Sequence, residues 1–239
     1  MVNSFDKIAN DYDEDIYPLN TREFVLPTVD ILEKLSPGKD ILEFAVGTGR
    51  IAIPLSKRGF QLWGMDNSKK MLEVLSKKEG NQNVHMVYGD MSKTKLDKQF
   101  DMVYLIFNGI TYLLDLEKQV ACFQNTADHL KPGGIFVIET FIPRVDQIVK
   151  DDIAPYALEE EYLGFDKYDR INQLVTSYQY NLASKDTESY QTKHRYLWPS
   201  ELELMGKLTG FELLHKWENW EEEPLTSTSE DCIMVWKKK

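Results

Sequence analysis

The stretch that decides the fold is "DILEFAVGTGRIAIPL", residues 40–55. A short apolar run leads to two glycines one residue apart, and a segment with helical character follows. Gly47, Gly49 and Ala52 satisfy the G-x-G-x-x-[GA] spacing of a nucleotide-binding turn, and Asp66 follows about 20 residues later, where an acid can bind ribose hydroxyls. Glycines in such a turn permit positive φ and let a ligand approach the backbone closely. The stretch therefore predicts a strand, a ligand-binding turn and a helix.

The rest of the first 141 residues alternates strand-like and helix-like segments, which is typical of an α/β fold with a parallel sheet and crossover helices. We expect strands near 40–46, 60–65, 84–88, 100–107 and 134–141, with helices near 20–35, 49–58, 68–79 and 115–130.

The residue pattern changes after residue 141. From 142 to 197 the sequence is rich in aromatic and polar residues that alternate with a period of two. The period indicates an antiparallel hairpin that turns at "SKDTES". One face of its first strand would carry Leu174, Thr176, Tyr178, Tyr180 and Leu182, and one face of its second strand Tyr190, Thr192, His194 and Tyr196.

The last forty residues predict a short helix that begins at Ser200 as N-cap and stops at Gly210, followed by two strands that close the sheet. We interpret the whole chain, 1–239, as a single domain. Within it, 1–35 would be an N-terminal helical lid, and 142–197 an antiparallel insertion over the acceptor site.

Composition limits the function classes. The formal net charge of −11 opposes long-range attraction to polyanions, so no nucleic-acid partner is expected. The apolar stretch "MVYLIFNGITYLL", 102–114, is too short and too polar to span a bilayer, so no membrane partner is expected either. Cys122 and Cys232 lack metal-ligand spacing and predict buried thiols, no metal site and a cytoplasmic location. The composition favours a small-molecule partner and leaves open whether the chain forms a homodimer.

Glu43 narrows the choice of ligand. It lies four residues before Gly47, near the carboxyl end of the first strand, where its carboxylate would repel a pyrophosphate. S-adenosylmethionine (SAM) has no phosphate, and its sulfonium and ammonium groups favour a nearby carboxylate. SAM therefore fits this turn better than a dinucleotide does.

At this point the sequence resembles the class I SAM-dependent methyltransferases over most of its length. "ILEFAVGTGR" resembles the first motif of that family, "GMDNSKKML" the second and "VYGDM" the third. "FDMVYLIFNGITYL" is similar to the fourth strand with its following turn, and "LKPGGIFVIE" to the entry of the fifth. The chain most resembles members that methylate small molecules, such as sugar-nucleotide amine N-methyltransferases. The resemblance implies a Rossmann-like, mostly parallel sheet of seven strands, with helices on both faces, an antiparallel last strand and a small antiparallel insertion.

The resemblance also implies the site residues. The cofactor-binding set would be Tyr12, Tyr17, Glu43, Ala45, Gly47, Gly49, Asp66, Asn67, Asp90, Met91, Phe107 and Asn108. Acceptor contacts would come from Tyr112, Tyr178 and Tyr180, and His194 is the candidate base because it shares a face with tyrosines of the insertion.

The reaction that the family implies is direct in-line transfer of the SAM methyl group to a small-molecule N or O acceptor, with orientation as the main contribution of the protein. Two alternatives stay open. An NAD(P)-dependent oxidoreductase shares the glycine spacing, and a SAM-binding protein without catalysis shares the motifs.

Overall fold

The computed structural model describes residues 4–13, 22–182 and 188–239 of the chain. Two sheets dominate it, a mixed sheet of seven strands and a smaller antiparallel sheet of four. The strands of the large sheet are β1 (Asp40–Phe44), β2 (Gln61–Asp66), β3 (Val84–Tyr88), β4 (Phe100–Leu105), β5 (Leu130–Phe141), β10 (Phe211–Trp217) and β11 (Asp231–Lys238). The main helices are α1 (Arg22–Leu35), α2 (Ala52–Lys57), α3 (Lys69–Lys77), α4 (Leu116–His129) and α5 (Pro199–Leu208).

The large sheet has the order β10-β11-β5-β4-β1-β2-β3, in which the strands β1 to β5 are parallel and β11 is antiparallel to β5. The strand order reverses between β1 and β4, because the chain leaves β3 at one edge and re-enters beside β1. Ligands of open α/β sheets bind at such a switch point, outside the carboxyl ends of the strands. The predicted Rossmann-like sheet with an antiparallel last strand is confirmed.

The two faces of the large sheet have separate hydrophobic cores. On one face, Val29 and Leu32 of α1 and Leu55 of α2 pack with Ile41 of the first strand. On the other face, Phe123 of α4 and Met205 of α5 pack with strand residues that include Phe136 and Trp236. Helices therefore cover both faces, as the resemblance implies.

Three local predictions differ from the structure. The second helix begins at Ala52, not at residue 49, because Gly49 has a φ of +80° that no helix contains. β5 begins at Leu130, before the predicted 134, with a register shift against β4 that accommodates Pro132 and Gly133. The N-cap of α5 is Trp198, not Ser200, because its N–H donates to the Glu201 carboxylate at 2.9 Å and Pro199 occupies the first helical position.

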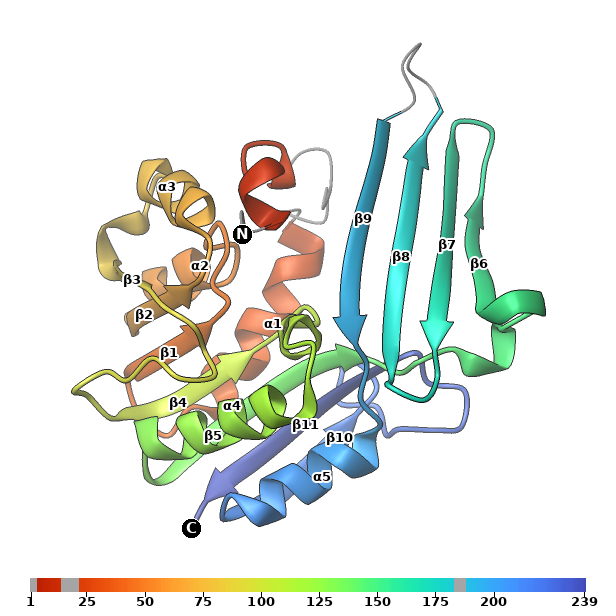
Figure 1. Cartoon of the computed structure of the whole chain (residues 1–239). Coiled ribbons are helices and arrows are strands. Elements are labelled where there is room, and N and C mark those ends of the chain that lie inside the picture. Colours follow the sequence, from red (N-terminus) through yellow and green to blue (C-terminus); the bar gives the residue numbers. More distant parts are fainter. Residues whose placement is uncertain (1–3, 14–21, 183–187) are drawn as a thin grey trace.

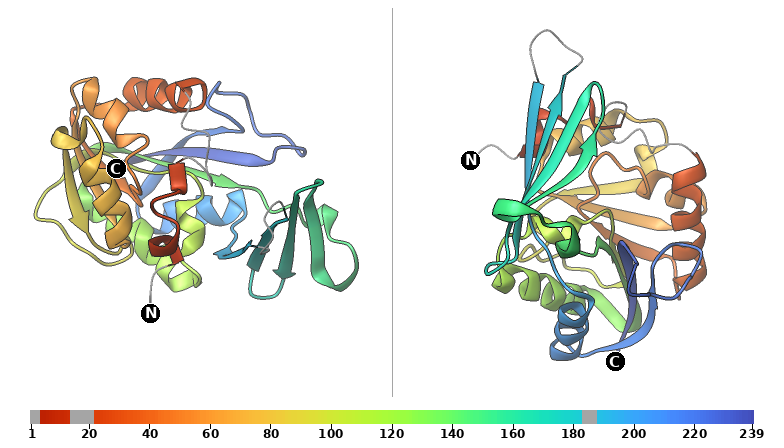
Figure 2. Two further views of the ribbon diagram at one scale, coloured as in Figure 1. Left: turned by 90° about the horizontal axis from the view of Figure 1, so that it is seen from above. Right: turned by 90° about the vertical axis from the view of Figure 1, so that its right-hand side faces the viewer.

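The small sheet contains the expected hairpin, β8 (Leu174–Asn181) and β9 (Glu188–Arg195), and two further strands, β6 (Ile153–Leu158) and β7 (Tyr162–Asp169). Its order is β6-β7-β8-β9. Figure 1 and the left view of Figure 2 show it standing to one side of the large sheet, with the N-terminal segment between it and α3. The boundaries of a lid at 1–35 and an insertion at 142–197 stay predictions.

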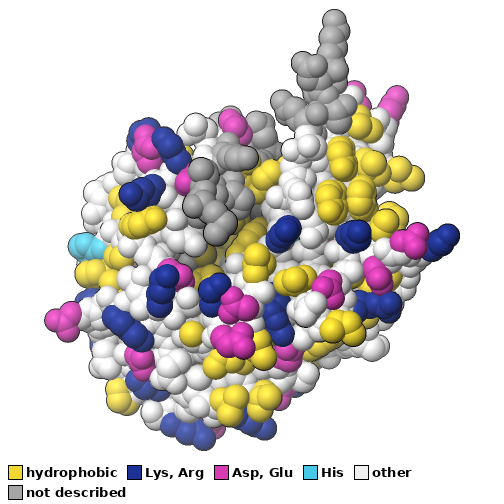
Figure 3. Space-filling view, viewed as in Figure 1, with side chains coloured by type: hydrophobic (Ala, Val, Ile, Leu, Met, Phe, Trp, Pro, Cys, Tyr) yellow, Lys and Arg dark blue, Asp and Glu magenta, His cyan; other side chains and the backbone are white. Residues whose placement is uncertain are grey.

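Hydrophobic side chains gather on the surface over the small sheet in Figure 3. No helix in the described part of the chain is both long enough and apolar enough to cross a membrane. Cys122 and Cys232 are buried free thiols, as expected.

Candidate functional site

A pocket lies at the switch point, outside the carboxyl ends of β1, β2, β3 and β4. We call it the strand-end pocket. It is lined by Phe5, Tyr12, Glu43, Ala45, Val46, Gly47, Thr48, Arg50, Ile51, Asp66, Asn67, Met71, Gly89, Asp90, Met91, Ile106, Phe107, Gly109, Tyr112 and Leu113. Nine of the predicted cofactor residues are in this lining, namely Tyr12, Glu43, Ala45, Gly47, Asp66, Asn67, Asp90, Met91 and Phe107.

The glycine turn forms the floor of this pocket. Gly47 has a φ of +55°, and its N–H donates to Asp66 Oδ2 at 2.8 Å. A Cβ at Gly47 would meet no closer protein atom than the Ala45 carbonyl oxygen at 4.0 Å, so the space above it is open for a ligand. Gly49 differs, because a Cβ there would lie 2.3 Å from Leu75 Cδ1. Gly49 therefore serves the packing of the turn on α3 and does not line the pocket.

Asp66 is the last residue of β2 and is almost fully buried. Its second carboxylate oxygen, Oδ1, accepts a hydrogen bond from Ser68 N at 2.7 Å, so both oxygens are fixed by backbone donors. Burial raises the pKa of Asp66, and the bonds from Ser68 and Gly47 oppose that rise. Each oxygen keeps a second lone pair for a ligand hydroxyl.

Glu43 is buried at the end of β1, where Tyr104 Oη donates to its Oε2 at 2.7 Å. Burial raises the pKa of Glu43 to about 8, against the lowering effects of the Tyr104 bond and the Arg50 charge. The carboxyl group is therefore mostly protonated at neutral pH while no cation is present. A bound cation would favour the ionised form.

Arg50 belongs to the pocket although the sequence analysis did not select it. Its guanidinium lies 3.6 Å from the centre of the Phe107 ring. Its charge lowers the pKa of Glu43 on β1 and of Glu139 on β5, the two strands that flank β4. Its position at the end of the "GTGR" motif was the sequence signal that could have identified it.

Glu139 is a second residue that the sequence did not identify. Its carboxylate accepts hydrogen bonds from Phe107 N at 2.9 Å and from Trp220 Nε1 at 2.7 Å.

Asp90 and Met91 line the opposite end of the pocket, after β3. Asp90 Oδ1 accepts hydrogen bonds from Ser92 N at 2.9 Å and from Ser92 Oγ at 2.6 Å. Burial alone would raise the pKa of Asp90, but these bonds and the charge of Lys93 hold it below its usual value. Asp90 therefore stays ionised and fixed beside the pocket.

The N-terminal segment covers the pocket from the side of α3. Asp13 Oδ1 accepts from Thr48 Oγ1 at 2.7 Å, and Asp13 also pairs with Lys78. The Phe5 ring packs edge-on against Tyr112 with centroids 4.8 Å apart. Tyr12, one of the predicted cofactor residues, lines the pocket. Tyr17 lies outside the described residues.

A second cavity of about 450 Å³ lies between the N-terminal segment, the ends of β4 and β5 and one face of the small sheet. We call it the sheet-face cavity. Small-sheet residues in its lining are Ala154, Pro155, Tyr156, Tyr162, Asp166, Tyr168, Val175, Ser177, Gln179, Tyr190, Thr192 and His194. Its other neighbours include Asn108, Phe141, Arg144, Glu230 and Asp231. Phe5, Tyr12 and Tyr112 line both cavities, so the two meet at an aromatic collar.

Besides Gly49, three predicted residues lie elsewhere than expected. Asn108 lines the sheet-face cavity and not the strand-end pocket, with a φ of +62° and its Oδ1 accepting from Phe141 N at 2.6 Å. Tyr178 and Tyr180 are absent from the cavity lining. Both stack on Phe165, at 5.1 and 6.2 Å between centroids, on the opposite face of the small sheet. The cavity takes the alternate residues Ser177 and Gln179 instead.

His194 lies in the sheet-face cavity, and its ring centroid is 4.6 Å from that of Tyr112 at the collar. Its Nδ1 is 2.8 Å from Thr111 Oγ1, and its Nε2 is 3.0 Å from Thr192 Oγ1. Thr111 Oγ1 donates its one proton to the Asn108 carbonyl oxygen at 2.7 Å. The Thr111 oxygen can therefore only accept a hydrogen bond from His194, so Nδ1 carries the proton of the neutral ring. Burial lowers the pKa of His194 to about 4, so the ring is neutral at physiological pH.

Known proteins resemble this chain in sequence and in fold. The Methyltransferase domain family matches residues 41–134. Cypemycin N-terminal methyltransferase from Streptomyces sp is 24% identical over 202 residues, 83% of this chain and 82% of its own length.

Two solved structures share the fold. The CcbJ methyltransferase of Streptomyces caelestis has a TM-score of 0.87 at 25% identity, covering 99% of this chain and 98% of its own. SAM-bound CalS10, an amino pentose methyltransferase from Micromonospora echinaspora, has a TM-score of 0.71 at 17% identity, covering 91% of both chains. The motifs around the strand-end pocket, the fold and these matches agree, and together they support a SAM-dependent methyltransferase.

Proposed function

We propose that the protein transfers a methyl group from SAM to a nitrogen or oxygen atom of a small-molecule acceptor bound in the sheet-face cavity. The observation that carries the proposal is the aromatic collar of Phe5, Tyr12 and Tyr112, at which the strand-end pocket meets the sheet-face cavity. A cofactor in one cavity and an acceptor in the other would bring their reacting ends together at this collar.

The residues present fit SAM. The open space above Gly47 suits close approach of a ligand, and a pair of opposite charges suits the amino-acid end. Glu43 and Arg50 both line the pocket, where Glu43 would accept hydrogen bonds from the ammonium group and Arg50 would donate to the carboxylate. Asp66 would bind the ribose hydroxyls, and Asp90 with Met91 would contact the adenine.

When bound, SAM supplies an electrophilic methyl group that an acceptor lone pair takes directly as the carbon–sulfur bond breaks. The chain's own contribution is to orient the two molecules and to exclude water with the collar, and orientation of this kind contributes roughly 7 to 11 kcal/mol in well-aligned cases. Phe5 and Tyr12 of the N-terminal segment present aromatic faces on which a cationic centre is stabilised.

His194 is our candidate for the group that takes the acceptor proton. Its neutral ring lies beside Tyr112, and Nε2 can exchange a proton through Thr192 Oγ1. Such a base contributes most when the acceptor is a hydroxyl group, because an amine is partly deprotonated on its own.

Two of the matching proteins support a small-molecule acceptor, since one is a cypemycin N-terminal methyltransferase and the other an amino pentose methyltransferase. The same matches give no support to an oxidoreductase or to a binding protein without catalysis.

Calorimetric titration with SAM, S-adenosylhomocysteine and NADH tests the cofactor first. We expect binding of the first two and none of NADH, and NADH binding alone would refute the proposal. A screen of small amines and phenols for S-adenosylhomocysteine production then tests the transfer. Binding of SAM with no turnover on any acceptor of either class would favour the binding protein instead.

A further inference from the structure

The wall of the sheet-face cavity is a regular grid of side chains. In the middle row, Asp166 of β7 pairs with Ser177 of β8, and Ser177 pairs with Thr192 of β9. The row on one side consists of Tyr168, Val175 and His194 in the same strand order. His194 marks the end of the grid that meets the collar, and Asp166 lies two strands away from it.

Strand spacing sets the distance across this grid. Neighbouring strands are about 4.7 to 4.9 Å apart, so Asp166 is on the order of 10 Å from the Thr192 and His194 end. An acceptor that contacts both must therefore be elongated.

In the described part of the chain, the carboxyl group of Asp166 is held by a hydrogen bond and not by an ion pair. Ser177 Oγ donates to its Oδ1. Throughout 4–13, 22–182 and 188–239, no lysine, arginine or histidine forms an ion pair with it, and burial raises its pKa. By contrast, Glu230 at the cavity rim pairs with Arg144 at 2.8 Å. A half-buried carboxylate without a cation is costly unless a ligand completes it.

Two tyrosines flank this carboxylate. Tyr156 lies over Gly164, where a Cβ would be 2.3 Å from its ring, so the missing side chain of Gly164 gives the ring its place on the cavity wall. Tyr168 is two residues beyond Asp166 on the same strand and the same face. The negative charge of Asp166 contributes to raising the pKa of both phenols, which places both near it. A carboxylate between aromatic rings is a favourable environment for an ammonium group.

We propose that Asp166, with Tyr156 and Tyr168, binds a cationic group of the acceptor at a point on the order of 10 Å from the atom that is methylated. The acceptor is then an elongated molecule that carries an ammonium or comparable cation at its far end. This inference rests on the proposed function, because it assumes that the methyl group is transferred at the collar.

A pair of probes that differ at one end tests the inference. Protein saturated with S-adenosylhomocysteine is titrated calorimetrically with 8-amino-1-octanol and with 1,8-octanediol, which lacks the cation. We expect the amino alcohol to bind about ten-fold more tightly, because it can form one partly desolvated charge pair with aromatic contacts. Asp166→Asn, which keeps the shape and the Ser177 bond, should reduce this ratio to about one.

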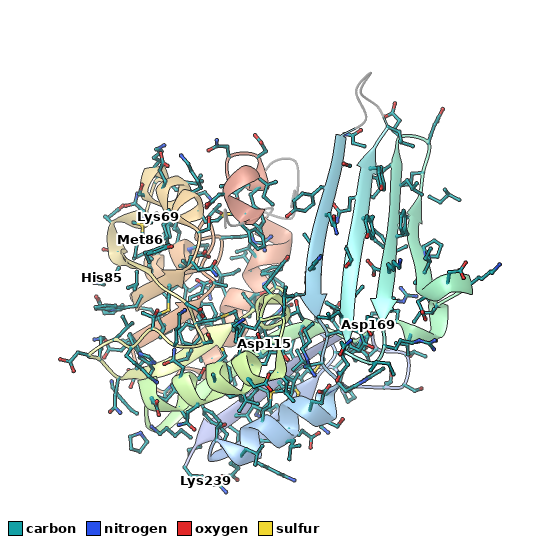
Figure 4. All side chains as sticks on the ribbon, viewed as in Figure 1. Lys69, His85, Met86, Asp115, Asp169 and Lys239 are labelled. Atoms are coloured by element: carbon teal, nitrogen blue, oxygen red, sulfur yellow. The ribbon has the colours of Figure 1, made fainter. Side chains whose placement is uncertain are left out.

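The matched control is Asp169→Asn, at the end of the same strand, which Figure 4 labels. Asp169 accepts bonds from Ile171 N and Asn172 N in an exposed turn, outside the cavity lining, so the ten-fold ratio should persist. Tyr156→Leu removes an aromatic face without touching the carboxylate and should lower the ratio about three-fold.

Equal affinities for the two probes in the unaltered protein, an unchanged ratio in Asp166→Asn, or no binding of either probe would each overturn the inference. Failure of the proposed function would appear earlier, as absence of S-adenosylhomocysteine binding. Unchanged affinity for S-adenosylhomocysteine in each variant verifies that it is folded.

Discussion

The strand-end pocket is built from turns at the ends of four parallel strands, whereas the sheet-face cavity is built on the flat face of an antiparallel sheet. In the pocket, backbone conformation determines the geometry, since Ala45, Gly47 and Phe107 all have positive φ. In the cavity, side chains determine it, because β7, β8 and β9 pair without a register shift and alternate residues face the cavity. The two regions therefore differ in how tightly the fold constrains their residues.

This difference indicates how proteins of one fold can bind the same cofactor and yet accept different acceptor molecules. A turn that needs left-handed backbone tolerates few residues at each position. A sheet face accepts many side chains without altering the strands beneath it. Substitutions in the pocket should therefore affect SAM, and substitutions in the cavity should affect the acceptor alone.

The largest effect is expected for Gly47→Val, which would fill the open space above the turn. We expect SAM affinity to fall by on the order of 100-fold or more, because the branched side chain blocks the ligand and strains a residue at a φ of +55°. Calorimetry measures the dissociation constant. Gly59→Val is the matched control, since Gly59 has a φ of +87°, a Cβ there would have no atom within 4 Å, and the residue does not line the pocket. If both variants bind SAM equally well, the turn is not the cofactor site.

The next largest effect is expected for His194→Ala in the sheet-face cavity. We expect the rate constant for turnover to fall about 10- to 100-fold while SAM affinity stays unchanged, because a positioned base contributes to proton removal alone. The pKa of His194 is lowered to about 4 by burial, so its protonation should slow the unaltered enzyme near pH 4 and not near 6.5. Steady-state rates across pH, with parallel SAM titrations, measure both effects. An unaltered rate would remove His194 as a base.

An effect of about ten-fold on SAM affinity is expected for Glu43→Gln, through loss of one partly solvent-excluded charge interaction. In the unaltered protein, SAM affinity should rise with pH, because burial raises the pKa of Glu43 to about 8 and the cationic cofactor favours the ionised carboxylate. The variant should lose this rise. Titrations between about pH 6 and 9 measure it, and a parallel pH dependence in both proteins would place the titrating group elsewhere.

The same residue should affect folding stability in the opposite direction. Glu43 binds a proton in the folded state up to about pH 8, whereas in the unfolded chain it releases the proton near its ordinary pKa of 4.5. The unfolded state therefore binds fewer protons between these values, and the free energy of unfolding falls as pH rises from 4.5 to about 8. Denaturant unfolding without ligand should show this decline, and Glu43→Gln should flatten it. A decline of equal size in the variant would contradict the buried position.

The strand-end pocket was largely predictable because its signals are local. Positive φ, strand ends and helix starts each require particular residues at fixed spacing, so Gly47, Asp66 and Asp90 could be selected from the sequence. Gly49 satisfied the same motif for another reason, since it packs on Leu75. A spacing rule cannot separate a glycine that admits a ligand from one that admits a neighbouring side chain.

The sheet-face cavity was predictable only in outline. A period of two indicated strands at 174–182 and 190–196, but it leaves open which of the two faces is buried. Both faces of β8 carry polar or aromatic residues, so Tyr178 and Ser177 were equally suitable by pattern. β6 and β7 were missed as well, and Asp166 with them. The choice depends on contacts with the turn Gly109–Tyr112 and with Phe141 at the end of β5, which lie far away in the sequence.

The smallest effect concerns this choice of face. Tyr190→Ala, which alters a residue of the cavity wall, should raise the KM for an acceptor found in the screen about three- to five-fold through lost aromatic contact area. Tyr180→Ala removes the same side chain from the opposite face, where it stacks on Phe165, and should leave that KM within about two-fold of the unaltered value. Thermal unfolding of both variants corrects for stability. A larger KM change for Tyr180→Ala than for Tyr190→Ala would mean that the acceptor binds the outer face, and the grid of Asp166, Ser177 and Thr192 would then have no ligand to contact.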